Sequence, residues 1–115
     1  MTEERPSLPN FLVVNGLEYT VIEGGHEYRS ETESKYFGTA NHELQTITVW
    51  SGLLTRQKAF VLVHEAVHCA IKRWSTLPTE EEGICDIAGY TLGEIFVNNP
   101  AFLRWYVWAL GQGGS

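Results

Sequence analysis

Apolar and polar positions alternate weakly over the first third of the chain, as they do in strands with one buried face. Between residues 11 and 22 the apolar positions fall into two runs, and Asn15-Gly16 lies between them. An Asn-Gly pair between two such runs is the strongest short signal for a β-hairpin. We therefore expect a hairpin here, preceded by a loose polar arm over residues 1–10.

A second strand region follows a polar loop over residues 23–35. Residues 36–40 are compatible with a short strand, which a turn at Asn41-His42-Glu43 ends. The segment Leu44–Trp50 reads L-Q-T-I-T-V-W, and its threonines and β-branched residues are typical of a strand. If this strand lies at an edge of the sheet, it can bind an extended peptide by strand addition.

The spacing of apolar residues then changes to the helical period. From Thr55, the expected N-cap, to Trp74 the apolar positions recur every three or four residues. Leu77-Pro78 ends that helix, and Thr79 with Glu82 matches a capping box for the next one.

The second helix is expected to run to about Val97 and to stop at Asn98-Asn99-Pro100. A short aromatic helix follows, which either covers the core or forms an exposed apolar patch. Its aromatic residues are Phe102, Trp105, Tyr106 and Trp108.

Strands followed by helices predict an α+β domain, with a small antiparallel sheet packed on a helical layer. The 115 residues favour one domain, which we place at 11–110, with a flexible glycine-rich tail over 111–115. The formal net charge of −6 argues against nucleic-acid and anionic-membrane partners. The start of the chain resembles no signal peptide, so a cytoplasmic location with reduced thiols is expected. Cys69 and Cys85 are then small core residues.

The segment V-L-V-H-E-A-V-H-C-A contains the candidate metal-binding and catalytic residues. His64 and His68 are four residues apart, so in a helix they lie on one face and can each direct a nitrogen at one ion. Glu65 projects from the same turn and can act on a metal-bound water as general base, the arrangement of an H-E-x-x-H metallopeptidase. The alternative is a pair of ordinary, partly buried histidines that hydrogen-bond to neighbours.

A catalytic zinc usually has three protein ligands and one water. Glu82 opens the following helix and is the predicted third ligand, with Glu81 and then Asp86 as alternatives. Asp86 lies one turn further and is predicted to orient His64 from outside the ligand set. Two glycines at 89 and 93 continue this face, and we expect them to let the helix approach the histidine helix closely.

The remaining candidates are less specific. Cys69 is expected to point away from the metal, because it lies about a quarter turn from His68. His26 and His42 fall in predicted loops, where either can contact substrate or stabilise an oxyanion, and no spacing selects one.

The blocks L-V-H-E-A-V-H-C-A and E-E-E-G-I-C-D-I-A-G-Y-T-L, with a helix ending at N-N-P, resemble the small zincin-like metallopeptidase-type proteins of tailed phages and prophages. The resemblance spans roughly residues 11–105 and implies a minimal core similar to the gluzincin group. In thermolysin-like members a glutamate ligand is followed four residues later by an aspartate that supports the first histidine, and Glu82 and Asp86 match that pair. The distance from His68 to Glu82 is shorter than in those enzymes.

The chain is therefore expected to bind one Zn²⁺ and to hydrolyse a peptide or protein substrate, with Glu65 as general base. The alternative function is a non-catalytic, zinc-stabilised module of phage origin that binds another protein.

Overall fold

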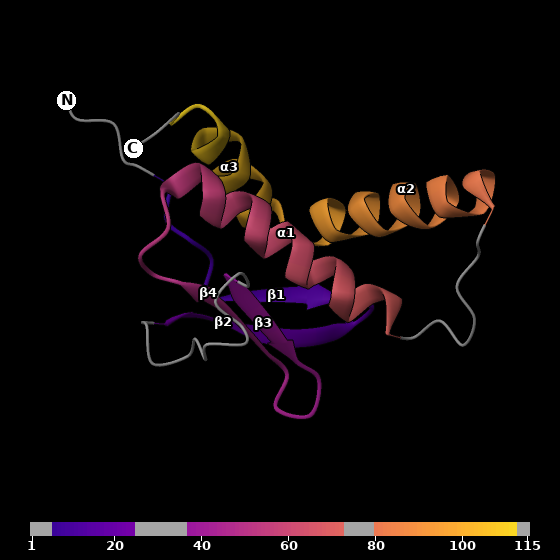
Figure 1. Ribbon diagram of the computed structural model, residues 1–115, viewed down its shortest axis with the longest axis horizontal. Helices are drawn as coiled ribbons and strands as arrows, with labels where there is room; N and C mark the ends of the chain where they lie inside the picture. Colours follow the sequence, from indigo (N-terminus) through magenta and orange to yellow (C-terminus); the bar gives the residue numbers. More distant parts are fainter. Residues whose placement is uncertain (1–5, 25–36, 73–79, 113–115) are drawn as a thin grey trace.

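The computed structural model of the 115-residue chain describes residues 6–24, 37–72 and 80–112. Strands precede helices, and the expected α+β class is confirmed. The elements are β1 (Phe11–Val14), β2 (Leu17–Gly24), β3 (Gly38–Asn41), β4 (Thr46–Trp50), α1 (Thr55–Ile71), α2 (Glu81–Asn98) and α3 (Pro100–Leu110). Figure 1 shows the sheet on one side of α1, with α3 near the start of that helix and α2 projecting beyond its end.

The predicted hairpin joins β1 and β2. Asn15 has a φ of 53° and Gly16 a φ of 79°, so both central residues of the turn have the positive φ of a type I′ turn. The strands pair antiparallel, with Val14 opposite Leu17 next to the turn. The Asn15 side chain also donates a hydrogen bond to the carbonyl of Ala70 at 2.9 Å, which ties the turn to the end of α1.

We expected an antiparallel sheet, but the sheet is mixed. The strand order is β1-β2-β4-β3, and β4 pairs parallel with β2 and antiparallel with β3. The strand over residues 46–50 is therefore an interior strand, which corrects the suggestion that it binds substrate at an edge. Its Ile47 and Val49 side chains are fully buried, as suits a strand with neighbours on both sides. Among the strands of the described residues, β3 lies at one edge of the sheet instead, and β1 lies at the other.

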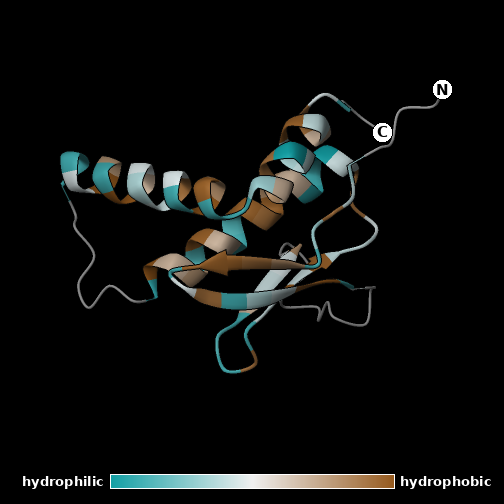
Figure 2. Ribbon diagram, turned by 180° about the vertical axis from the view of Figure 1, so that it is seen from behind, coloured by the Kyte–Doolittle hydropathy of each residue, from teal (hydrophilic) through white to brown (hydrophobic). Residues whose placement is uncertain are grey.

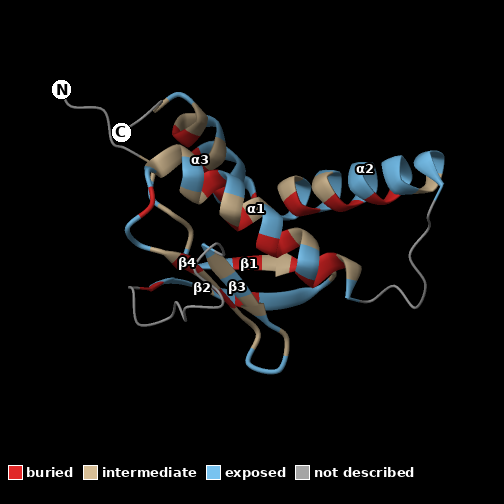
Figure 3. Cartoon of the chain, viewed as in Figure 1, coloured by how far each residue is buried: buried red, intermediate tan, exposed pale blue. Residues whose placement is uncertain are grey.

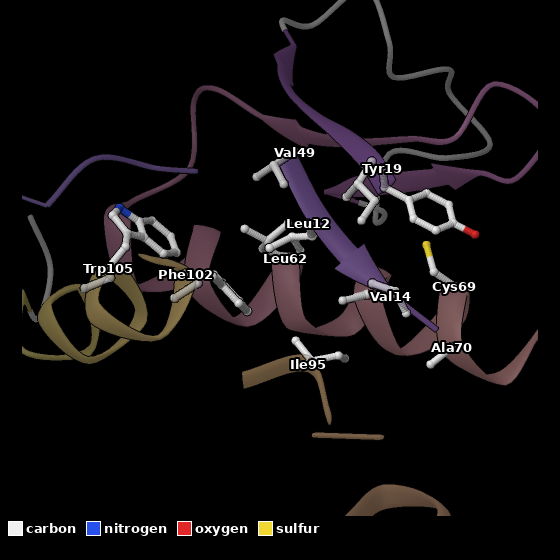
Figure 4. Close-up of a cluster of buried hydrophobic side chains, with 14 of the residues drawn as sticks. Leu12, Val14, Tyr19, Val49, Leu62, Cys69, Ala70, Ile95, Phe102 and Trp105 are labelled. Carbon is white, nitrogen blue, oxygen red and sulfur yellow. The ribbon is translucent and has the colours of Figure 1, made fainter. Parts of the chain in front are cut away.

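The apolar face of α1 packs on the sheet. Leu62 and Ala66 are fully buried against residues such as Leu12 and Val49, as Figure 4 shows for Leu12, Val49 and Leu62. The helix begins at Thr55 as expected, but Thr55 is not its N-cap. Leu54 holds that position, and its N–H donates to the side-chain oxygen of Gln57 at 3.1 Å.

The aromatic helix α3 covers the core, which was one of the two positions expected for it; the other was an exposed apolar patch. Pro100 occupies its first turn, where the missing N–H has no intrahelical partner to lose. Phe102 and Trp105 are buried, and Phe102 packs against Phe96 of α2 at a ring separation of 5.6 Å. Near the start of this helix, Leu8 packs against the same cluster, so the expected arm is not loose throughout.

Helix α2 begins at Glu81 with Glu80 as N-cap, later than the capping box predicted, and Thr79 lies outside the described residues. Ile87, Thr91 and Ile95 are its buried residues, and Figure 3 shows most of its remaining surface exposed. The colouring by hydropathy in Figure 2 shows apolar and polar residues mixed along this helix. In the described part of the chain, no helix has the length and apolar character that crossing a membrane requires.

Asn99, between α2 and α3, fastens these helices to β1. Its side-chain oxygen accepts a hydrogen bond from the N–H of Val13 at 2.7 Å, and its side-chain nitrogen donates to the carbonyl of Val13 at 2.8 Å. The same nitrogen donates to the carbonyl of Ile95 at 2.7 Å. One buried amide thus pairs with the outer edge of β1 much as a strand residue does.

Replacing Asn99 with Ala is expected to lower the free energy of unfolding by about 2–3 kcal/mol, because the partly buried backbone groups of Val13 and the buried carbonyl of Ile95 lose their partner. Urea unfolding measures the change. The neighbouring exposed Asn98 is the control, and Asn98→Ala is expected to stay within about 0.5 kcal/mol of the parent chain. Equal effects of the two substitutions would contradict the role given to Asn99.

Candidate active site

The packing of α1 decides where the motif side chains lie. Each residue turns a helix by about 100°, so once Leu62, Ala66 and Cys69 face the core, His64 and His68 must face away from it. Both histidines are exposed.

The two imidazoles converge on one point. The Nε2 atoms of His64 and His68 are 3.2 Å apart, and the ring centroids are 4.8 Å apart. Two nitrogens that are each about 2.0–2.1 Å from one tetrahedral ion lie about 3.3–3.4 Å from each other. The nitrogen pair therefore has the separation that a shared zinc ion requires. As ordinary histidines, the same two rings form an N–H···N hydrogen bond.

Glu65 lies between the histidines and the core. It is only 7% exposed, and its Oε2 is 4.0 Å from Nε2 of His64. Burial raises the pKa of its carboxyl group, and the nearby His64 and His68 partly oppose that rise. A carboxylate with a raised pKa is a stronger proton acceptor, which suits a general base.

These three side chains open into a cavity of about 310 Å³ between α1 and the edge strand β3. The β3 side of the cavity consists of Gly38, Thr39 and Ala40, and His42 from the following turn completes the lining. An extended peptide placed along β3 would thus pass the motif residues.

Gly38 allows β3 to lie this close to α1. A Cβ at this position would come within 2.6 Å of a methyl carbon of Val61 and 2.8 Å of the carbonyl oxygen of Thr48. It would also lie 3.3 Å from Cγ of Glu65. The absence of a side chain at Gly38 therefore helps to set the position of the buried carboxylate.

The predicted carboxylate ligands do not join the histidines. Glu82 and Asp86 are exposed on α2. No three His, Cys, Asp or Glu side chains among residues 6–24, 37–72 and 80–112 form a group that could hold one metal ion. The reason lies in the rotation of α2, because Ile87 and Ile95 turn inward and place both acids roughly opposite.

The two glycines that share this face correct a second expectation. Gly89 and Gly93 were predicted to bring α2 close to α1, but a Cβ at either position would meet no atom within 4 Å. Both glycines are exposed and face the solvent with Glu82 and Asp86.

The cysteines differ in their surroundings. Cys69 is buried, as expected, and it hydrogen-bonds the hydroxyl of Tyr19. Figure 4 shows these two side chains side by side at the carboxyl end of α1. Burial raises the pKa of the Cys69 thiol to about 11. Cys85 is exposed on α2, which corrects the expectation of two core residues, and no disulfide joins them.

His42 is the site residue that sequence reasoning did not select. Burial lowers its pKa, and the charges of Lys72 and His68 lower it further. Residues 38, 40 and 42 share one face of an extended chain, so strand alternation continued from Gly38 would have placed His42 on the α1 side. His26, the other candidate, lies outside the described residues.

Comparison of the chain with protein-family models, with curated proteins and with solved structures gave no match.

Replacing Gly38 with Ala is expected to lower the free energy of unfolding by about 1–3 kcal/mol, because the new methyl group overpacks the contact with Val61. Gly93→Ala is the matched control. It adds the same methyl group in open space inside a helix, so it is expected to stabilise the chain by about 0.5–1 kcal/mol. Thermal and urea unfolding of both variants measure the two shifts. A stable Gly38→Ala chain would show that β3 does not lie tightly on α1.

Proposed function

We propose that this protein is a zinc-dependent peptidase whose metal is held by His64 and His68, with Glu65 as general base. The observation that carries the proposal is the 3.2 Å separation of the two Nε2 atoms beside a buried carboxylate. The resemblance to small zincin-like phage proteins, which rests on the same residues, supports it further.

Zinc at this position would polarise the scissile carbonyl and make a water molecule more acidic. A residue of the chain itself then transfers the proton. An oxygen of the Glu65 carboxylate accepts it from the attacking water and delivers it to the nitrogen of the leaving amine. The partial burial of Glu65 keeps this carboxylate basic and away from bulk water.

The edge strand β3 is the proposed binding place for the substrate backbone. Its partner β4 is on one side, and the cavity with the motif residues is on the other. An extended peptide that adds to β3 gains main-chain hydrogen bonds and lies along the cavity. β3 therefore takes the peptide-binding role that the sequence suggested for the strand over residues 46–50, which is an interior strand.

The third zinc ligand is proposed to be Glu82, with Glu81 and Asp86 as alternatives. Helix α2 contacts the rest of the chain through residues such as Thr91 and Ile95, and its amino-terminal turns project outward (Figure 1). A carboxylate from those turns therefore reaches the histidines only if the helix both shifts and turns about its axis relative to α1. Binding of zinc would favour such a shift, because two histidines leave ligand positions to fill.

Glu65→Gln is expected to bind zinc as the parent chain does and to unfold at the same temperature, while peptide cleavage falls at least about 10²-fold. Metal content and turnover of a mixed library of fluorescence-quenched peptides measure this. Glu94→Gln, an exposed carboxylate of α2, is the control and should leave cleavage unchanged. Equal activity of Glu65→Gln and the parent chain would exclude Glu65 as the base.

His64→Ala and Glu82→Ala are each expected to lose the single zinc ion, whereas Glu81→Ala keeps it. Metal analysis of the purified variants, after equilibration with one equivalent of zinc, provides the measurement. Retention of zinc in Glu82→Ala together with loss in Glu81→Ala or Asp86→Ala would move the ligand to that neighbour. Retention in His64→Ala would remove the basis of the metal site.

A non-catalytic module that binds another protein is the second candidate. The observation that favours it is the exposure of apolar side chains on α2, where Tyr90 and Val97 are more than three-quarters exposed and Ile84 is about half exposed. The Glu65→Gln variant separates the two candidates, since a module of this kind keeps its function without the general base.

A further inference from the structure

His42 shares the cavity with the motif residues but belongs to a different part of the fold. It follows the edge strand β3, whereas His64, Glu65 and His68 come from α1, and all four line the same space of about 310 Å³. A peptide lying between β3 and α1 would therefore have the histidine pair on one side and His42 on the other.

The ring of His42 lies beside Tyr19. The phenolic oxygen of Tyr19 lies 3.5 Å from Nδ1 of His42, and the rings meet edge to face with centroids 6.3 Å apart. Tyr19 is 3% exposed, and its hydroxyl also contacts the Cys69 thiol, so its position is set by the core. When this hydroxyl donates to Nδ1, the ring proton of a neutral His42 lies on Nε2, the nitrogen left for the cavity.

The other lining residues do not offer an equivalent donor. Gly38 and Ala40 have no polar side-chain atom. Thr39 is opposite Thr48 in the strand register and lies on the alternate face of β3 from Gly38, which contacts α1. The two α1 histidines direct their Nε2 atoms at each other. His42 is thus the lining side chain, among the residues that the structure describes, that remains free to donate to a substrate.

We propose that His42 is a catalytic residue that donates a hydrogen bond from Nε2 to the carbonyl oxygen of the bound peptide, and that Tyr19 is the positioning residue that holds this tautomer. The proposal rests on the proposed function, because it uses the same cavity and the same substrate. A donor placed where negative charge develops on that oxygen lowers the barrier to attack by water.

Binding of acetohydroxamate to the zinc-loaded chain tests the proposal without requiring turnover. This small molecule presents an oxygen anion and a carbonyl oxygen to a metal site. We expect His42→Ala to bind it about tenfold more weakly by titration calorimetry, while zinc content and unfolding temperature stay unchanged. His42→Gln, whose amide can still donate, is expected to recover most of the affinity. Glu43→Ala, in the same turn but outside the cavity lining, is the control.

Peptide turnover and NMR provide two further readouts. In His42→Ala we expect kcat to fall about 10²–10³-fold with little change in KM. In Tyr19→Phe, which keeps the ring and removes only the hydroxyl, ¹⁵N spectra of the His42 ring are expected to show loss of the single Nε2–H tautomer. A role of Tyr19 in packing alone would leave that tautomer unchanged.

The outcomes separate this proposal from the proposed function. Loss of zinc in His42→Ala would make His42 a ligand and overturn its role as donor, and parent-like hydroxamate affinity with zinc retained would overturn that role as well. Failure of the parent chain to bind zinc would overturn the proposed function and this inference together. Zinc binding and the expected loss of hydroxamate affinity without any peptide cleavage would overturn peptide hydrolysis alone, leaving His42 as the donor to an oxygen ligand.

Discussion

The contact between the apolar face of α1 and the sheet is the constraint on which the site depends. Small residues such as Ala59 and Ala66 are fully buried there, so the helix axis can approach the strands closely. This packing fixes the rotation of the helix about its axis. The directions of His64, Glu65 and His68 then follow from the helical repeat and need no contacts of their own. A change in the core would turn all three side chains together.

The same contact explains why Glu65 is unusual. A carboxylate that is 7% exposed beside a hydrophobic core loses hydration, and an apolar residue at this position would stabilise the helix packing better. The chain therefore carries a local energetic cost at the residue that the proposed chemistry uses. Gly38 adds to this cost. It leaves room for the carboxylate beside β3, but a glycine loses more conformational entropy on folding into a strand than other residues do.

Local patterns predicted the elements that depend on neighbouring residues. The Asn15-Gly16 turn, the helix of the motif and the break before Pro100 are set by backbone preferences and by the spacing of apolar residues. The parallel pairing of β2 with β4 could not be predicted in this way, because residues 20 and 46 are far apart in the sequence and no local pattern indicates that they pair. Pairing of distant strands depends on the whole sheet, including the edge position of β3.

The site was predictable to a similar extent. The spacing of His64 and His68 was sufficient, since a helix brings them together by geometry alone. The position of Glu82 depends on which face of α2 packs inward, and shared spacing among acidic residues does not decide that. Ile87 and Ile95 do decide it, and the acids lie on the far side. To predict the direction of the His42 side chain, the position of β3 has to be known, because that direction follows from the alternation of side chains that begins at Gly38.

The amide of Asn99 also gives the two borders of the sheet different properties. Unprotected strand borders allow molecules to join through backbone pairing, and growth into a fibre needs two such borders on every molecule. At β1 the outward N–H and carbonyl of Val13 are already occupied. Among the described residues no strand lies beyond β3, so association through that border would end at a pair of molecules.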